Sequence, residues 1–231
     1  MVKISIVIPC YQDEENLRCL LEQLQGMPDR PMEIIVVDGA GSKFCSSICK
    51  THQAHWLTSQ PCRGQQLLMG AAHAQGEVLW FLHTDVRLSL NAFASMMRVI
   101  ENGAIGGFFR FRFDTPIDWP AYILEWAIML RCGLGVPYGD QGVFILRDRY
   151  HAIGGHAPWP LFEEVPLVQG ARKMGRFVAL NEPIFVSSRR WRQDGWWRRT
   201  WNNRELALKF ACGVSPRILA QRYQAMKTSA K

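Results

Sequence analysis

The chain has 231 residues, 48% of them hydrophobic, which is enough to bury the core of one large domain without disulfides or a structural metal. Its seven cysteines are scattered and include no C-x-x-C pair, which argues against a disulfide framework or zinc knuckle and indicates a reducing, cytoplasmic environment. The formal net charge is +7, but residues 186–231 hold eleven basic and only two acidic side chains, so the protein is not a uniformly basic nucleic-acid binder.

The N-terminal part of the sequence predicts strands and helices in alternation. Residues 3–9 form a compact, mostly β-branched run that predicts a strand, so we expect no signal peptide. Leucines at helical spacing predict a helix over residues 14–24, and residues 33–38 predict a second strand that ends on an aspartate. A helix over 44–51 and a strand over 54–57 are expected next.

The alternation of predicted strands and helices continues to about residue 113. A helix is expected over 63–74, a buried strand over 78–82, and a helix over 90–100. Phe and Arg alternate over 108–113, which predicts a half-exposed strand. This order predicts a mostly parallel α/β sheet, and the absence of a G-x-G-x-x-G loop after the first strand argues against a dinucleotide-dependent dehydrogenase.

Residues 119–136 form a long apolar stretch that at first resembles a membrane span. Glu125 and Arg131 lie within it, and each would cost ~2.5–3.5 kcal/mol at the centre of a bilayer. We therefore expect a helix that is buried or faces an interface rather than a span.

The remaining elements are shorter. A tight polar turn is expected at 139–142, a strand over 143–146, and a helix that begins near 161–165 and runs toward 174. Two short strands are expected over 177–180 and 184–187.

The C-terminal segment is dense in Trp and Arg and predicts amphipathic helices as far as about residue 223. Trp and Arg together suit a bilayer interface, so one hypothesis is peripheral association with the inner face of the cytoplasmic membrane. The alternative is that these helices pack on the sheet and expose a solvated basic face. We expect no nucleic-acid partner, because no motif for one occurs. The clustered tryptophans are Trp191, Trp196, Trp197 and Trp201.

Five carboxylates follow predicted strands or open predicted helices, and any one of them alone could be a helix cap. Because the carboxyl ends of parallel strands meet at one edge of a sheet, we expect these acids to converge there, near Arg63. Mg²⁺ and Mn²⁺ bind carboxylate and phosphate oxygens and take one or two protein carboxylates, so the set suits a metal-bridged diphosphate. The acids are Asp38, Asp85, Asp140, Glu163 and Glu164.

Several short motifs resemble, in their order and spacing, the inverting family 2 glycosyltransferases of GT-A fold. The motifs that carry this resemblance are Ile6-Val7-Ile8-Pro9 with Tyr11 and Glu14-Glu15-Asn16, Val36-Val37-Asp38-Gly39, His83-Thr84-Asp85, Phe162-Glu163-Glu164-Val165 and Ser187-Ser188-Arg189-Arg190-Trp191. Three segments resemble a small bacterial subgroup named for association with radical-SAM and selenium-related proteins, also labelled arsenosugar biosynthesis. They are Arg63-Gly64-Gln65-Gln66, Gly139-Asp140-Gln141-Gly142 and Arg189-Arg190-Trp191.

The resemblance implies an α/β GT-A fold, with a Rossmann-like, mostly parallel sheet flanked by helices and followed by C-terminal amphipathic helices. Residues 1–188 would form the catalytic domain, with a nucleotide half at about 1–100 and an acceptor half at about 101–188. Residues 189–231 would form a basic, Trp-rich helical segment packed on that domain.

The resemblance also implies transfer of a sugar from a nucleotide-diphosphate sugar to an acceptor hydroxyl, with inversion and a Mg²⁺ or Mn²⁺ ion. The acceptor would be a small molecule or a lipid-linked alcohol. Asp85 and His83 would hold the metal, and Glu164, with Glu163 beside it, would be the catalytic base. Residues expected to contact acceptor or sugar are Asp140, Gln141, Arg190 and Trp191. Residues expected to bind the nucleotide-sugar are Pro9, Tyr11, Glu14, Asp38, Arg63, Gly64, His83, Thr84 and Asp85.

Three positions depart from the family pattern. Lys43 stands where an acid is usual, His83 replaces the first aspartate of the metal motif, and Glu164 replaces an aspartate. These departures keep open a non-catalytic protein of the same fold that binds nucleotide-sugar or acts as a scaffold at a membrane surface. A nucleotidyltransferase would share the sheet and the metal, but the Gly-rich basic loop after the first strand is missing.

Overall fold

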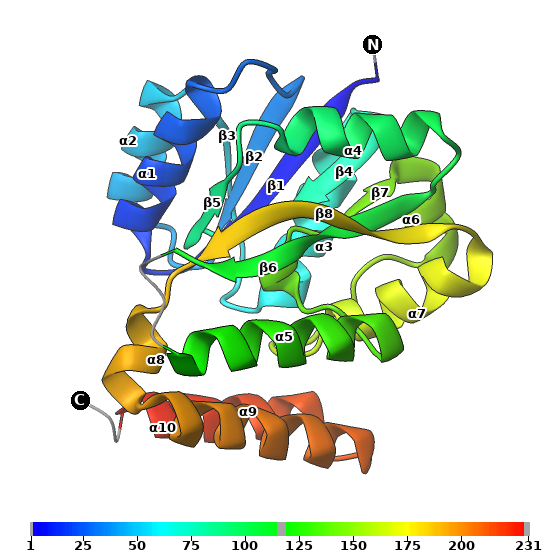
Figure 1. Ribbon diagram of the computed structural model, residues 1–231. Coiled ribbons are helices and arrows are strands. Elements are labelled where there is room, and N and C mark those ends of the chain that lie inside the picture. The colour runs from blue at the N-terminus through cyan, green and yellow to red at the C-terminus, as the bar shows by residue number, and fades with distance from the viewer. Residues whose placement is uncertain (1, 115–118, 229–231) are drawn as a thin grey trace.

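The computed structural model describes residues 2–114 and 119–228, except for the side chains of Leu134, Arg190 and residues 225–228. One eight-stranded sheet, in the order β3-β2-β1-β4-β7-β6-β8-β5, forms the centre of the molecule, and helices cover it (Figure 1). The predicted α/β architecture is confirmed. The sheet is mixed, with a parallel first half and a second half of both strand directions.

The four strands of the first half are all parallel. They are β1 (Ile4–Cys10), β2 (Glu33–Asp38), β3 (His55–Thr58) and β4 (Val78–Phe81). Cys10 pairs with Asp38 and Ile4 with Val78, so the ends of β1, β2 and β4 reach the same edge of the sheet. Central strands buried on both faces read as continuous apolar runs, which is why the sequence predicted them well.

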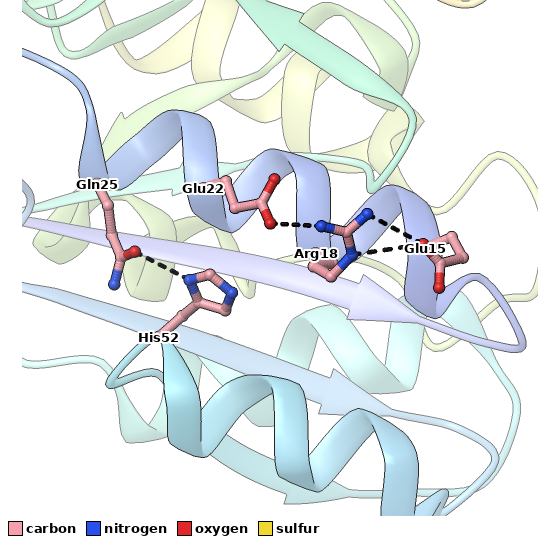
Figure 2. Close-up of polar contacts among 5 residues, drawn as sticks. All are labelled: Glu15, Arg18, Glu22, Gln25 and His52. Atoms are coloured by element: carbon pink, nitrogen blue, oxygen red, sulfur yellow. Dashed lines mark hydrogen bonds and ion pairs between the residues drawn. The ribbon is translucent and has the colours of Figure 1, made fainter.

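Helices of this half pack on both faces of the sheet. Leucines of α1 (Glu14–Gln25) and cysteines of α2 (Lys43–Thr51) pack with Ile6 and Ile8 of β1, while Leu67 of α3 (Arg63–His73) packs on the other face. On the outer surface of α1, Arg18 lies between Glu15 and Glu22 (Figure 2). Gln25 and His52 join α1 to the end of α2, with 2.9 Å between Oε1 and Nδ1.

The second half of the sheet contains one strand that the sequence did not predict. The strands are β5 (Val86–Leu88), β6 (Gly106–Phe113), β7 (Phe144–Leu146) and β8 (Phe177–Val186). Strand β5 was not predicted, because three residues are too few to show a strand period. Strand β8 is one strand rather than the two expected, because two extra residues between Ala179 and Pro183 shift its register against β6.

The remaining helices surround this half of the sheet. Helix α6 was not predicted from the sequence. Helix α5 packs one face on β6 and exposes another face to solvent. Among residues 2–114 and 119–228, no helix combines the length and the hydropathy that a membrane span requires. The helices are α4 (Ala92–Glu101), α5 (Trp119–Leu134), α6 (Arg147–Ile153), α7 (Glu164–Met174), α8 (Arg189–Asp194), α9 (Trp196–Ala211) and α10 (Pro216–Thr228).

The C-terminal helices pack against the rest of the protein through aromatic contacts. Figure 1 shows α9 and α10 as an outer layer beside α5. Phe162, in the loop before α7, stacks on Phe210 of α9 with 4.6 Å between ring centroids. Trp191 and Trp196 both place their rings edge-on to Phe113 of β6. The segment after residue 188 therefore forms one wall of the structure next to the loop that carries Glu163 and Glu164.

Candidate active site

A cavity of ≈360 Å³ lies beyond the end of β4, between the sheet and the C-terminal helices. Its lining combines carboxylates with side chains of α5 and α9, some apolar and some cationic. The polar residues on its wall include His83, Asp85, Asp140 and Glu164, which come from three separate segments of the chain. The convergence expected for these acids is thus present for Asp85, Asp140 and Glu164.

The segment after β4 brings His83 and Asp85 to the cavity wall. All four residues of β4 are buried, so the polar side chains begin where the strand ends. The indole N–H of Trp80 donates to the carbonyl of Gly142 at 3.1 Å, which ties β4 to the turn that carries Asp140. Thr84 points elsewhere, because its hydroxyl donates to the Asp13 carboxylate. Thr84 therefore shapes the turn and does not line the cavity.

Asp140 lies in the short 3₁₀ turn Gly139–Gln141, which ends at Gly142 with a φ of +59°. Its Oδ1 is buried and accepts no hydrogen bond from the described part of the chain. Burial raises the pKa of Asp140, the negative charge of Asp85 raises it further, and the nearby Arg131 guanidinium opposes both effects. Asp85 and Asp140 therefore share one electrostatic environment, which favours a cation or a proton between them.

Glu164 opens α7 and is almost fully buried. Its Oε1 accepts the Gly139 N–H at 3.2 Å, and its Oε2 is buried without a hydrogen bond from any described residue. Burial raises the pKa of Glu164 to about 8, the charge of Glu163 adds to this, and Arg63 opposes it. A buried carboxyl with a high affinity for protons, and one oxygen open for a ligand, has the properties of a general base.

Glu163 is paired rather than open. It is completely buried, and the Arg63 guanidinium donates to both of its oxygens, with 3.0 Å between Nη2 and Oε2. Phe162 just before it has a φ of +62°, a left-handed conformation that is strained for an aromatic residue. The stacking of Phe162 on Phe210 and the Arg63 pair together hold this backbone in place, so Glu163 fixes the position of Glu164.

The predicted nucleotide-binding residues at the ends of β1 and β2 lie outside this cavity. The Asp38 carboxylate accepts the N–H groups of Ala40 and Ser42 at 2.8 and 2.7 Å and so shapes the loop after β2. Tyr11 is half exposed, and Pro9 and Glu14 are partly buried at the same sheet edge. Their contacts with a nucleotide stay predictions.

Two predicted binding residues have structural partners. Gly64 is buried, and its N–H donates to the Trp159 carbonyl at 2.9 Å, so it permits close packing at the start of α3. The Gln141 amide is buried between the Cys132 thiol and the Phe109 carbonyl. The backbone of Arg190 lies in α8, but its side chain falls outside the described part of the structure.

Sequence reasoning missed several cationic and aromatic residues of the cavity wall. The Arg131 guanidinium lies over the Tyr138 ring, 4.1 Å from the ring centroid. The Arg199 guanidinium lies 4.9 Å from the ring centroid of Trp191, and of these four residues only Trp191 had been predicted as a site residue. Arg199 also pairs with Asp194 at 2.5 Å. The one available signal was Arg131 itself, a charge inside a long apolar stretch, because such a charge needs a buried partner or a polar cavity.

A divalent cation fits this wall only with help from a ligand. In the described ranges, no group of three or more His, Cys, Asp or Glu side chains is arranged to hold a metal. Mg²⁺ and Mn²⁺ at phosphate sites need only one or two protein carboxylates, and the phosphate and water supply the remaining oxygens. Asp85, with the open Oδ1 of Asp140 near it, meets that smaller requirement.

Comparison with known families gives a clear result. Residues 5–153, which is well over half of the chain, match the family described as Glycosyl transferase family 2. The chain belongs to glycosyl transferase family 2. The matched region contains β2 to β4, all of β1 after Ile4, the His83-Thr84-Asp85 segment and the Asp140 turn. Among curated protein sequences, none matches significantly.

Solved structures share the fold of this family 2 glycosyltransferase. Glucosyl-3-phosphoglycerate synthase from Mycobacterium tuberculosis, in complex with Mn²⁺, UDP and glucosyl-3-phosphoglycerate, superposes with a TM-score of 0.61 at 16% identity. The match covers 79% of this chain and 70% of that one. The same enzyme in complex with Mg²⁺ and UDP also gives a TM-score of 0.61, and with Mn²⁺, UDP-glucose and phosphoglyceric acid it gives 0.60, both at 16% identity and the same coverage. The GT-A fold predicted from the motifs is confirmed.

Proposed function

We propose that the protein transfers a sugar from a nucleotide-diphosphate sugar to an acceptor hydroxyl in one inverting displacement. The observation that carries this proposal is the state of Glu164. Its carboxyl is buried, its pKa is raised to about 8, and its Oε2 accepts no hydrogen bond from a described residue. Glu164 and Asp85 both line the cavity. A base and a diphosphate-binding acid on one cavity wall are what this reaction requires.

In the proposed displacement, Glu164 accepts the proton of the acceptor hydroxyl while the acceptor oxygen bonds to the anomeric carbon. The bond from that carbon to the diphosphate oxygen breaks, and the nucleoside diphosphate leaves with the electron pair. Attack from the face opposite the leaving group inverts the configuration. Glu163, held by Arg63, positions Glu164 and does not contact the substrate.

Asp85, with His83 beside it, would hold a Mg²⁺ or Mn²⁺ ion on the donor diphosphate. The ion would stabilise the negative charge that develops on the leaving diphosphate. Support comes from the carboxylate wall of the cavity and from the structurally similar synthase, whose solved complexes contain Mn²⁺ or Mg²⁺ with UDP. Tyr11, Glu14 and Asp38, at the ends of β1 and β2, would bind the nucleoside.

The acceptor would occupy the part of the cavity between Asp140 and the C-terminal helices. Asp140 and Trp191 line it, while Leu124 and Leu206 give it apolar walls. Arg131 and Arg199 add positive charge. This combination suits an acceptor with an apolar body and an anionic or hydroxyl-bearing end, either free or lipid-linked. We also propose membership of the small bacterial subgroup associated with radical-SAM and selenium-related proteins, on the strength of the motifs around Arg63, Asp140 and Trp191.

A second candidate is a non-catalytic protein that binds nucleotide-sugar. One observation favours it. Glu164 with a pKa of about 8 is mostly protonated at neutral pH. This candidate predicts donor binding without turnover at any pH.

One screen separates the two candidates. The wild-type protein is incubated with Mn²⁺, a panel of UDP-, GDP-, ADP- and dTDP-sugars, and a panel of small-molecule and lipid-linked alcohols as acceptors. Both the thermal shift and the release of nucleoside diphosphate are measured. The proposed function predicts that a donor that raises the melting temperature is also consumed, faster above pH 8 than at pH 6. Stabilisation by a donor without its consumption, across acceptors and pH values, would establish the binding protein instead.

A further inference from the structure

Helix α5 exposes a broad apolar face to solvent. Six large side chains on it are exposed, including Trp119 at 67% and Trp126 at 61%. At 100° per residue their positions fall on one side of the helix. The six residues are Trp119, Tyr122, Ile123, Trp126, Met129 and Leu130.

The opposite side of α5 is firmly attached, so the exposed face is not an alternative packing of the helix. Leu124 and Ala121 are buried in the main core. Glu125 is also buried, where its carboxylate accepts the Phe113 N–H at 2.8 Å and pairs with Arg112 at 2.6 Å. These contacts fix the rotation of the helix and direct the tryptophans outward.

Helix α9 extends the same surface. Trp197, Trp201, Arg204 and Leu208 are spaced by four, three and four residues, so they share one side of α9, and all four are exposed, Trp201 at 71%. The rings of Trp119 and Trp197 lie 5.9 Å apart, and Figure 1 shows α5 and α9 side by side. We call this surface, made of the six α5 residues with Trp197, Trp201 and Leu208, the α5–α9 face.

Helix α9 and the adjoining α10 expose several positive charges. Arg198 and Arg204 of α9 are exposed, as are Arg217 and Arg222 of α10. The three acids of α5, α8 and α9 are all paired: Glu125 with Arg112, Asp194 with Arg199, and Glu205 with Lys209. An apolar, Trp-rich centre with cationic edges matches an anionic bilayer, in which indole rings lie at the headgroup level and guanidinium groups contact phosphate.

We propose that the α5–α9 face docks the protein on an anionic membrane surface. A second copy of the chain is the weaker occupant, because two such faces would bring their cationic edges together. Helices α5 and α9 also line the cavity, so docking would place its apolar wall near the lipid. The proposal does not depend on the glycosyl transfer, and its test needs no donor.

Flotation with vesicles of phosphatidylcholine, with or without phosphatidylglycerol, tests the proposal. The wild type is expected to float with anionic vesicles at low salt and much less with neutral ones. Trp126→Glu and Trp201→Glu should each weaken binding by at least about tenfold. Arg198→Ala should weaken it by about fivefold at low salt, which corresponds to one lost cation at the surface.

Leu90→Glu is the matched control, because Leu90 is an apolar residue with 66% exposure in the loop before α4, outside the α5–α9 face. It adds the same charge and should bind like the wild type. A wild type that stays in solution at low salt overturns the proposal, and so do glutamate variants that float normally. Light scattering that shows a wild-type dimer, dissociated by Trp126→Glu, would assign the face to a second copy and also overturn it.

Discussion

Arg63, the first residue of α3, donates to both carboxylate oxygens of Glu163, which lies 100 residues later in the chain and is completely buried. The pair connects the start of α3 to the loop that carries Glu164. It also separates the roles of two adjacent acids. Glu163 is neutralised by Arg63, while Oε2 of Glu164, a residue of the cavity lining, accepts no hydrogen bond from a described residue.

Arg63→Ala is expected to destabilise the protein by about 3–5 kcal/mol, because it leaves the buried Glu163 carboxylate without its partner. Chemical denaturation measures the change. The double variant Arg63→Met with Glu163→Gln removes both charges and should be more stable than Arg63→Ala. If Arg63→Ala alone unfolds like the wild type, the pair does not hold the Glu164 loop.

Asp85→Ala should weaken metal-dependent binding of the donor by at least about tenfold, because the diphosphate loses the carboxylate that brings the cation to it. Titration of the donor with and without Mn²⁺ measures this effect, and a chelator should weaken wild-type binding in the same way. Asp148→Ala is the matched control, since Asp148 is an exposed acid of α6 paired only with its neighbour Arg149. Unchanged Mn²⁺ dependence in Asp85→Ala would remove Asp85 from the metal site.

Gly64→Ala tests whether Gly64 serves packing. A Cβ at Gly64 would lie 2.0 Å from the Ala157 carbonyl oxygen, so the loop before α7 must move, at a cost of about 1–3 kcal/mol. Gly133→Ala in α5 is the control, because a Cβ there meets nothing within 4 Å and alanine favours a helix by about 1 kcal/mol. The melting temperature should therefore fall for Gly64→Ala and rise for Gly133→Ala. Equal melting temperatures would mean that the loop adapts without strain.

The raised pKa of Glu164 also predicts a pH-dependent stability. The folded carboxyl has a pKa of about 8 against an ordinary value of 4.5, so between these values the folded state binds more protons than the unfolded state. The wild type must therefore lose stability as pH rises from about 5 to 8. Glu164→Gln lacks this loss and should exceed the wild type by about 2–4 kcal/mol above pH 8 and by little at pH 5. A difference that does not vary with pH would mean that the Glu164 pKa is not raised.

The sequence predicted the first half of the fold well for a physical reason. Strands such as β2 and β4 are buried on both faces and therefore read as unbroken apolar runs between polar loops. It failed at β5, a three-residue strand too short to show a period, and at β8, where two extra residues break the alternation. It also left the outward side of α5 undefined, because an apolar composition cannot show which side of a helix stays uncovered.

Part of the candidate site could likewise be predicted from the sequence, and part of it could not. The motifs placed Asp85, Asp140 and Glu164 together. Asp85 follows the parallel strand β4, whereas Asp140 precedes β7, which runs antiparallel to β4 and so begins at the same edge of the sheet. The pairing of Arg63 with Glu163 and the positions of Arg131 and Arg199 depend on contacts between distant segments, which no local pattern encodes. Only the folded chain shows that Glu163 is paired and Glu164 is open.

The most direct test of the central claim compares the rate of nucleoside diphosphate release by the wild type and Glu164→Gln, with the same donor and Mn²⁺, above the Glu164 pKa of about 8. Glutamine keeps the shape of the side chain and cannot accept the acceptor proton. If Glu164 is the base, the variant should bind the donor as tightly as the wild type and turn it over about 10²- to 10⁴-fold more slowly. A Glu164→Gln variant that binds the donor and transfers its sugar at the wild-type rate would contradict the account.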